Sequence, residues 1–179
     1  LYQVGAAEIE PDQIAYPVRS VIRKKNNVDF FMASLESIKF KKNTVVTDRG
    51  EVKYDYLILA PGSSSNFFGT KGAEKNTLTL KSMNDALGLR NHILALFEKA
   101  SRCEDPAERK KCLNFVIVGG GPTGVEFAGA FAELVNGPLK RDFPGLDFSD
   151  FNITLVDVAK QLVSMYSEKS ADYVKRRLE

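Results

Sequence analysis

Hydrophobic residues recur between residues 28 and 62 with the spacing of β-strands. Two runs stand out, at residues 28–40 and 43–62, and Asp48-Arg49-Gly50 predicts a turn inside the second. The alternation in ASLESIKFK at 33–41 is typical of a half-buried antiparallel strand. The unbroken run YLILA at 56–60 is instead typical of a strand buried on both faces of a parallel sheet. This segment therefore predicts a β-rich region that ends in a parallel strand.

The chain before residue 28 and after residue 62 shows helical spacing, which alternates with strands in the C-terminal part. Pro17 interrupts the periodic positions of residues 1–27, which predicts an irregular segment there. After residue 80 the expected elements are helix 83–100, strand 113–120, helix 123–135, a loop over 137–150, strand 152–158 and a helix from about 168. A strand, helix and strand in this order are typical of a βαβ unit with parallel strands, so the predicted fold class is α/β.

Composition and charge leave the predicted fold unchanged but exclude several kinds of protein. The 179 residues are 44% hydrophobic and 27% charged with a net charge of +2, which is typical of a soluble globular protein and not of a nucleic-acid-binding one. No apolar run approaches a membrane span, and the N-terminus lacks the layout of a signal peptide. Cys103 and Cys112 fit neither a CxxC pair nor a zinc site, which favours two free thiols over a disulfide. Because the chain starts at Leu1 and ends inside a predicted helix, we expect a piece of a longer protein.

Three glycines after the strand at 113–120 spell GxGxxG. In such a turn the first glycine permits a tight bend, the second lets backbone approach a pyrophosphate, and the third lets the helix pack on the strand. The N–H groups at the start of that helix then attract phosphate. The alternative is a turn that only packs a strand against a helix. We predict a dinucleotide site formed by Gly119, Gly120, Gly121, Pro122, Thr123, Gly124 and Val125.

An acidic residue, Asp157, ends the strand that follows. A carboxylate there accepts hydrogen bonds from the adenosine ribose and repels a 2′-phosphate, which favours NAD(H) over NADP(H). Asp157 lies 33 residues after Gly124, further than usual, because residues 136–151 form an apparent insertion. The positive charge of Lys160, three residues later, slightly weakens this preference for NAD(H) over NADP(H).

No catalytic group of its own accompanies this predicted site. His92 is the only histidine, and Ser63-Ser64-Ser65 has no accompanying base. A nicotinamide site without acid–base residues is typical of hydride transfer to a second cofactor.

Four segments resemble one family of flavoproteins. KYDYLILAPGS at 53–63 resembles the second flavin-contacting motif of flavoproteins with two dinucleotide-binding domains, and VGGGPTGVEFAGAFAEL at 118–134 resembles the NADH motif of type II NADH dehydrogenases. Residues 1–22 and 79–94 also resemble segments of these single-subunit NADH:quinone oxidoreductases. The resemblance implies part of a Rossmann-like flavoprotein with an antiparallel β insertion before the NAD-binding βαβ unit. It also implies a flavin-domain segment over 1–110 and the first part of the NAD(H)-binding domain over 111–179.

The same resemblance implies roles for individual residues. Ala60, Pro61 and Gly62 would pass near FAD, with Pro61 standing where threonine is usual. Glu126 would lie near the nicotinamide as the catalytic-site residue. Its alternative role is that of a carboxylate stabilised by the helix dipole.

The implied activity is hydride transfer from NADH to FAD, with electrons passed on to a quinone of a respiratory chain. The parent would be peripheral to a membrane, on its cytoplasmic side or at the mitochondrial inner membrane, through a C-terminal segment outside this chain. The resemblance leaves open whether the parent forms a homodimer. The chain alone would be soluble and inactive, because half of the flavin site lies outside it. The alternatives are a non-catalytic NAD(H)-binding module and a flavoprotein similar to sulfide:quinone oxidoreductases.

Overall fold

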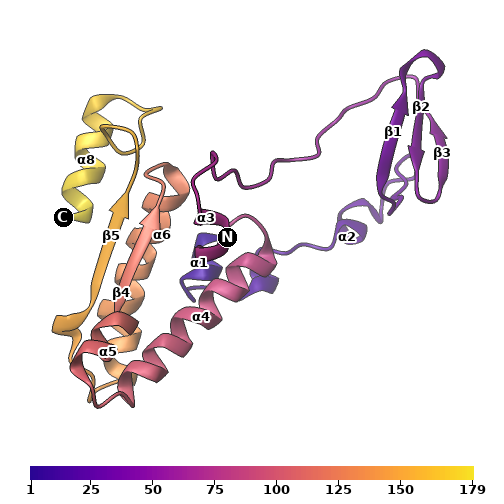
Figure 1. The fold of residues 1–179 in the computed structure, drawn as a ribbon. Coiled ribbons are helices and arrows are strands. Elements are labelled where there is room, and N and C mark those ends of the chain that lie inside the picture. The colour runs from indigo at the N-terminus through magenta and orange to yellow at the C-terminus, as the bar shows by residue number, and fades with distance from the viewer. The chain divides into compact units, whose positions relative to one another are not determined.

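The computed structural model describes residues 1–179 and divides them into two compact units (Figure 1). One unit contains Leu1–Pro11 and Ser65–Glu179, and the other contains Asp12–Ser64. Units defined in this way reflect packing and not the ligand that each part binds. The boundary at residue 110 between a flavin part and an NAD part therefore stays a prediction.

The Asp12–Ser64 unit is built on a small antiparallel sheet. Its strands β1 (Leu35–Lys39), β2 (Thr44–Thr47) and β3 (Gly50–Lys53) are hydrogen-bonded in the order β1-β2-β3. Thr47 pairs with Gly50 across the predicted turn, where Gly50 has a φ of 119° that favours glycine. The antiparallel strands and their turn are thus confirmed, but the first strand covers only Leu35–Lys39 of the predicted 28–40.

Ahead of this sheet the chain is irregular, as predicted. A short helix, α2 (Val18–Ile22), begins only after Pro17, which occupies its N-cap position. The 3₁₀ turn η1 (Pro11–Gln13) lies before this helix. Within the sheet, a second 3₁₀ turn, η2 (Phe40–Lys42), connects β1 to β2.

The prediction of a buried parallel strand at 56–60 is wrong. The segment has no strand hydrogen bonds, and Tyr56 and Ile58 are 95% and 91% exposed. A parallel strand needs neighbouring strands to pair its backbone groups, and no other strand of this chain pairs with it. The apolar run alone could not reveal the absence of such neighbours.

The other unit contains the predicted βαβ arrangement. Strands β4 (Asn114–Val118) and β5 (Asn152–Val156) run parallel, and Asn114 pairs with Asn152 at one end of the register. Helix α6 (Pro122–Leu134) connects them and packs against both (Figure 1). Residues alternate in β4, since Phe115 and Ile117 pack on the core while Val116 and Val118 are exposed.

The predicted loop over 137–150 begins too early. The helical path continues past α6 through the π-turn η3 (Val135–Leu139) and α7 (Lys140–Asp142). Buried Val135 and Leu139 hold this path against the core, and Pro138 lies within the π-turn. Asn136-Gly137-Pro138 was therefore a misleading loop signal, because apolar anchors on either side outweigh it.

The same compact unit contains further helices. Helix α4 (Met83–Ser101) begins at a capping box between Ser82 and Asp85, and α5 (Pro106–Cys112) begins at the N-cap Asp105. The remaining elements are α1 (Tyr2–Gly5), α3 (Ala73–Asn76), η4 (Phe148–Asp150) and α8 (Glu168–Leu178). Although α4 is 19 residues long, neither it nor any other helix has the length and apolar character that crossing a bilayer requires.

A phenylalanine cluster forms the base of the core. The ring of fully buried Phe97 on α4 lies about 6 Å, centroid to centroid, from four other rings. These belong to Phe115 on β4 and to Phe143, Phe148 and Phe151 in the insertion. The cluster therefore packs the insertion and α4 together against the βαβ unit.

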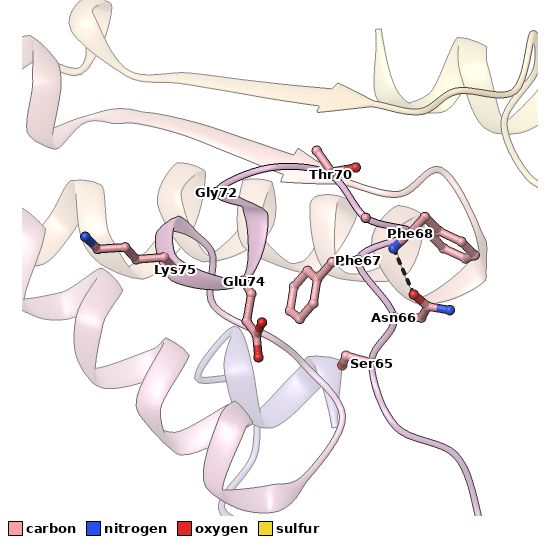
Figure 2. Close-up of a pocket in the computed structure, with 9 residues that line it drawn as sticks. Ser65, Asn66, Phe67, Phe68, Thr70, Gly72, Glu74 and Lys75 are labelled. Atoms are coloured by element: carbon pink, nitrogen blue, oxygen red, sulfur yellow. Dashed lines mark hydrogen bonds between the residues drawn. The ribbon is translucent and has the colours of Figure 1, made fainter.

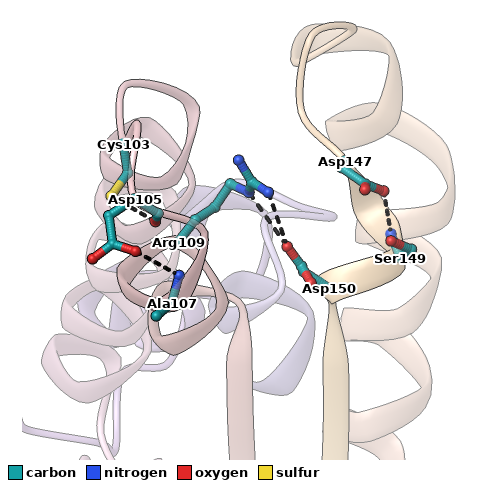
Figure 3. A network of polar contacts seen from close by, with 7 residues as sticks. All are labelled: Cys103, Asp105, Ala107, Arg109, Asp147, Ser149 and Asp150. Carbon is teal, nitrogen blue, oxygen red and sulfur yellow. Dashed lines mark hydrogen bonds and ion pairs between the residues drawn. The ribbon is translucent and has the colours of Figure 1, made fainter.

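An ion pair closes the same end of this unit (Figure 3). Nε and Nη2 of Arg109 on α5 each lie 3.3 Å from Oδ2 of Asp150, which is just before β5, and both side chains are 24% exposed. Each partner's segment has its own cap, because Asp105 accepts the Ala107 N–H and Asp147 accepts the Ser149 N–H. The pair therefore joins two locally ordered turns.

Candidate functional site

The glycine turn starts where the parallel strands end. Gly119 follows β4 directly and adopts a φ of 115°, which side chains rarely tolerate. Its N–H donates to the carbonyl of Val156, the last residue of β5, at 2.8 Å. The turn thus lies at the carboxyl edge of the strand pair, which is the edge where ligands bind in open α/β sheets.

Gly124 brings α6 close to this turn. A Cβ atom at Gly124 would lie 1.9 Å from the carbonyl oxygen of Gly119, so no side chain fits there. The third glycine of the GxGxxG pattern is required by the contact between helix and turn.

Gly121 lies in a different environment. It is the N-cap of α6, and a Cβ placed on it would meet no atom within 4 Å. No side chain caps the helix, and its first hydrogen bond runs from the Val125 N–H to the Gly121 carbonyl. The N–H groups of Thr123 and Gly124 therefore have no partner within the helix. Free donors beside open space on a glycine backbone fit a phosphate group.

Asp157 lies directly beside this turn. Its Oδ2 accepts the Gly120 N–H at 2.5 Å, and its Oδ1 accepts the Ala159 N–H at 2.6 Å. The hydrogen bonds from Ala159 and then from Gly120 lower the pKa of the Asp157 carboxyl below its ordinary value. The carboxylate is exposed and ionised at neutral pH. The contact between Asp157 and Gly120 could not be predicted from the spacing of residues in the sequence.

Glu126 belongs to the same helix end. It is exposed on the second turn of α6 and forms no ion pair. The structure thus gathers the glycine turn, Glu126 and Asp157 around the start of α6.

The three residues predicted to contact flavin belong to the other compact unit. Ala60, Pro61 and Gly62 are exposed in a segment without regular structure, and Gly62 has a φ of 73°. The turn, Glu126 and Asp157 all belong to the Leu1–Pro11 and Ser65–Glu179 unit.

A cavity of about 620 Å³ lies elsewhere in that unit (Figure 2). Residues between Ser65 and Lys75 line it, and the Asn66 side chain accepts the Phe68 N–H at 2.8 Å. None of the predicted site residues lines this cavity. The structure contains no group of histidine, cysteine and acidic residues able to hold a metal ion.

The remaining candidate groups lie away from the turn along the chain. Cys112 is buried just before the amino end of β4, whereas the turn follows its carboxyl end. Cys103 is half-buried and donates weakly to the Asp105 carbonyl, and His92 is exposed on α4.

Together, the parallel βαβ unit and its glycine turn define a Rossmann-like dinucleotide-binding protein. The family model described as pyridine nucleotide-disulphide oxidoreductase matches residues 2–179. The chain belongs to this family.

Particular relatives carry more specific names. The whole chain is 37% identical to the type II NADH:quinone oxidoreductase Ndh of Mycobacterium tuberculosis and covers 40% of that protein. Over 94% of its length it is 33% identical to the mitochondrial external alternative NADH-ubiquinone oxidoreductase of Yarrowia lipolytica, of which it covers 31%.

A solved structure is similar as well. The structure of NDH2 from Plasmodium falciparum in complex with NADH matches 98% of this chain with a TM-score of 0.86 and 25% identity, and the match covers 37% of that protein. The chain therefore spans well under half the length of the relatives that it matches.

Proposed function

We propose that this chain is part of a flavoprotein that transfers a hydride from NADH to FAD and passes the electrons to a quinone. The chain supplies the NADH-binding turn and one edge of the flavin site. The observation that carries the proposal is the uncapped glycine turn at the carboxyl ends of β4 and β5, in a chain 37% identical to a type II NADH:quinone oxidoreductase. A bound flavin would supply the redox chemistry, and this chain would bind and orient the nicotinamide nucleotide.

The parts of the site have separate roles in this proposal. The backbone of residues 119–125 holds the pyrophosphate through the N–H groups of Thr123 and Gly124. Asp157 accepts the adenosine ribose hydroxyls with the lone pairs that its backbone donors leave free, and its charge disfavours a 2′-phosphate. Glu126 lies beside the nicotinamide.

The flavin site is proposed for the other compact unit. Ala60, Pro61 and Gly62 form one edge of it, and the absence of side-chain bulk at Gly62 suits close approach of the cofactor. The flavin part extends over residues 1–110 and the NAD(H) part over 111–179.

The family relationship also supports a proposal for the electron acceptor and for the location. The electron acceptor is a quinone, as in the names of the curated relatives. The parent protein works at a membrane surface, cytoplasmic or mitochondrial.

The first experiment is a visible spectrum of the purified protein, followed by titration with NADH and then with a water-soluble quinone. For the parent protein we expect flavin bands that bleach with NADH and recover with quinone. For the 179-residue chain alone we expect NADH binding without turnover. Nucleotide binding by a colourless parent protein would contradict the proposal and favour a non-catalytic NAD(H)-binding module.

A matched pair of variants tests Glu126. Glu126→Gln in the parent protein is expected to slow flavin reduction by NADH, because it removes a charge beside the nicotinamide. Glu133→Gln removes another exposed carboxylate of α6 and is expected to leave the rate unchanged. Equal rates for the two variants would refute the role of Glu126.

A further inference from the structure

The segment after β5 folds back onto the glycine turn and holds one of its residues at two atoms. The Asp157 carboxylate accepts the Gly120 N–H, and the Val163 N–H donates to the Gly120 carbonyl at 2.7 Å. Both hydrogen-bonding groups of Gly120 are therefore occupied by residues of the same loop, 157–163.

Packing adds a third restraint at this position. A Cβ on Gly120 would lie 2.7 Å from Cδ2 of Leu162 and 3.2 Å from Cβ of Asp157. Gly120 is buried, and a methyl group there would fit only if the Leu162 side chain moved. At Gly121, by contrast, a Cβ would project into open space.

Val163 adopts a backbone conformation that its side chain disfavours. Its φ is 45°, in the left-handed region that β-branched residues rarely enter. The residue is nonetheless 4% exposed, and its carbonyl accepts the Tyr166 N–H at 2.8 Å. Such strain persists only where surrounding contacts over-determine the conformation, and it occurs preferentially near functional sites.

We propose that residues 157–163 form a clamp that fixes the Gly120 peptide groups and thereby aims the N–H donors of the following residues at the pyrophosphate. Asp157, Leu162 and Val163 are the positioning residues of this clamp. The inference rests on the proposed NADH site and deepens it, because Asp157 acquires a role through the turn that is separate from its contact with the ribose. Because Asp157 occupies its N–H, Gly120 itself offers the nucleotide no free donor.

The two roles of Asp157 can be distinguished by measuring the binding of two nucleotides. These are NADH and an NADH analogue that lacks both adenosine ribose hydroxyls. If Asp157 acts through the turn, Asp157→Ala weakens binding of both nucleotides by about tenfold, since each depends on the aimed N–H donors. If Asp157 acts only on the ribose, the analogue binds the variant as well as it binds the original protein, and the clamp is refuted. Asp172→Ala, which removes an exposed carboxylate on α8, is the control and leaves both affinities unchanged.

A rescue experiment tests the packing contact. Gly120→Ala is expected to weaken NADH binding because its methyl group displaces the loop at Leu162. Adding Leu162→Ala makes room for that methyl group and is expected to restore a measurable part of the affinity. A double variant no better than Gly120→Ala alone would contradict the role of Leu162.

Amide hydrogen exchange tests the clamp without any nucleotide. In the ligand-free protein the Gly120 amide should exchange slowly, and Asp157→Ala should accelerate it by at least about tenfold, because one hydrogen bond is lost. An unprotected Gly120 amide in the original protein would overturn the clamp.

Failure of the original protein to bind NADH would overturn the proposed function, and with it the role of the clamp in binding. NADH binding with a protected Gly120 amide, but with equal affinity in Asp157→Ala, would overturn the clamp alone.

Discussion

Replacing Gly124 by alanine is the sharpest test of how α6 meets the glycine turn. The new Cβ would lie 1.9 Å from the Gly119 carbonyl oxygen and 3.1 Å from its carbon, both backbone atoms that cannot rotate away. The helix must therefore retreat from the turn by about 1.5 Å to restore an ordinary contact distance. Overpacking typically costs about 1–3 kcal/mol, and a clash with backbone belongs at the upper end of that range. The helix preference of alanine over glycine offsets about 0.5–1 kcal/mol of this.

Gly129 provides a matched control in the same helix. A Cβ there meets no atom within 4 Å, so Gly129→Ala gains only the helix preference of about 0.5–1 kcal/mol. Two changes of identical chemistry should thus differ by about 3 kcal/mol in the free energy of unfolding.

Urea unfolding followed by circular dichroism measures this difference. With a net loss of about 2 kcal/mol, the melting temperature of Gly124→Ala should also fall by about 4–8 °C for a chain of this size. NADH affinity should fall as well, because the helix N-terminus moves. Equal unfolding midpoints for Gly124→Ala and Gly129→Ala would refute the argument from close approach.

Three further outcomes follow from other contacts. Phe97→Ala removes the central ring of the phenylalanine cluster and should cost about 3–5 kcal/mol in urea unfolding, whereas an unchanged midpoint would show that the ring is not central. A double-mutant cycle on Arg109→Ala and Asp150→Ala should give a coupling of about 0.5–1 kcal/mol, because the pair is only half-buried, and zero coupling would exclude a stabilising bond. The Asp157 carboxylate, whose pKa is lowered by its backbone donors, should contribute stability above about pH 4 that is lost as pH falls through its folded-state pKa; an NMR titration midpoint at or above the ordinary value would contradict this.

The glycine turn could be predicted from sequence because its determinants are local. Three glycines, a preceding apolar strand and Pro122 at the start of the helix specify the bend, and all lie within a few residues of one another. Helix α4 could be predicted for the same reason, since its periodicity and the Ser82 cap are both contiguous.

The failures have a common physical origin in distant contacts. The run at 56–60 has the composition of a buried strand, but a strand is defined by partners that its own residues do not specify. The contact between Asp157 and Gly120 joins residues 37 positions apart. The left-handed conformation of Val163 runs against its own preference and is imposed by the loop around it. Tertiary packing decided each of these features.

The phenylalanine cluster determines where the polypeptide can be divided. A protein shortened to begin at residue 111 would follow the predicted border of the nucleotide part, but it would discard Phe97 with α4. The rings of Phe115, Phe143, Phe148 and Phe151 would then face solvent where Phe97 had filled the space between them. An exposed aromatic surface of that kind promotes aggregation. Helix α4 precedes the nucleotide-binding module in sequence, but it packs against that module and completes its core. Any chimaera that grafts this module onto another protein must therefore include α4.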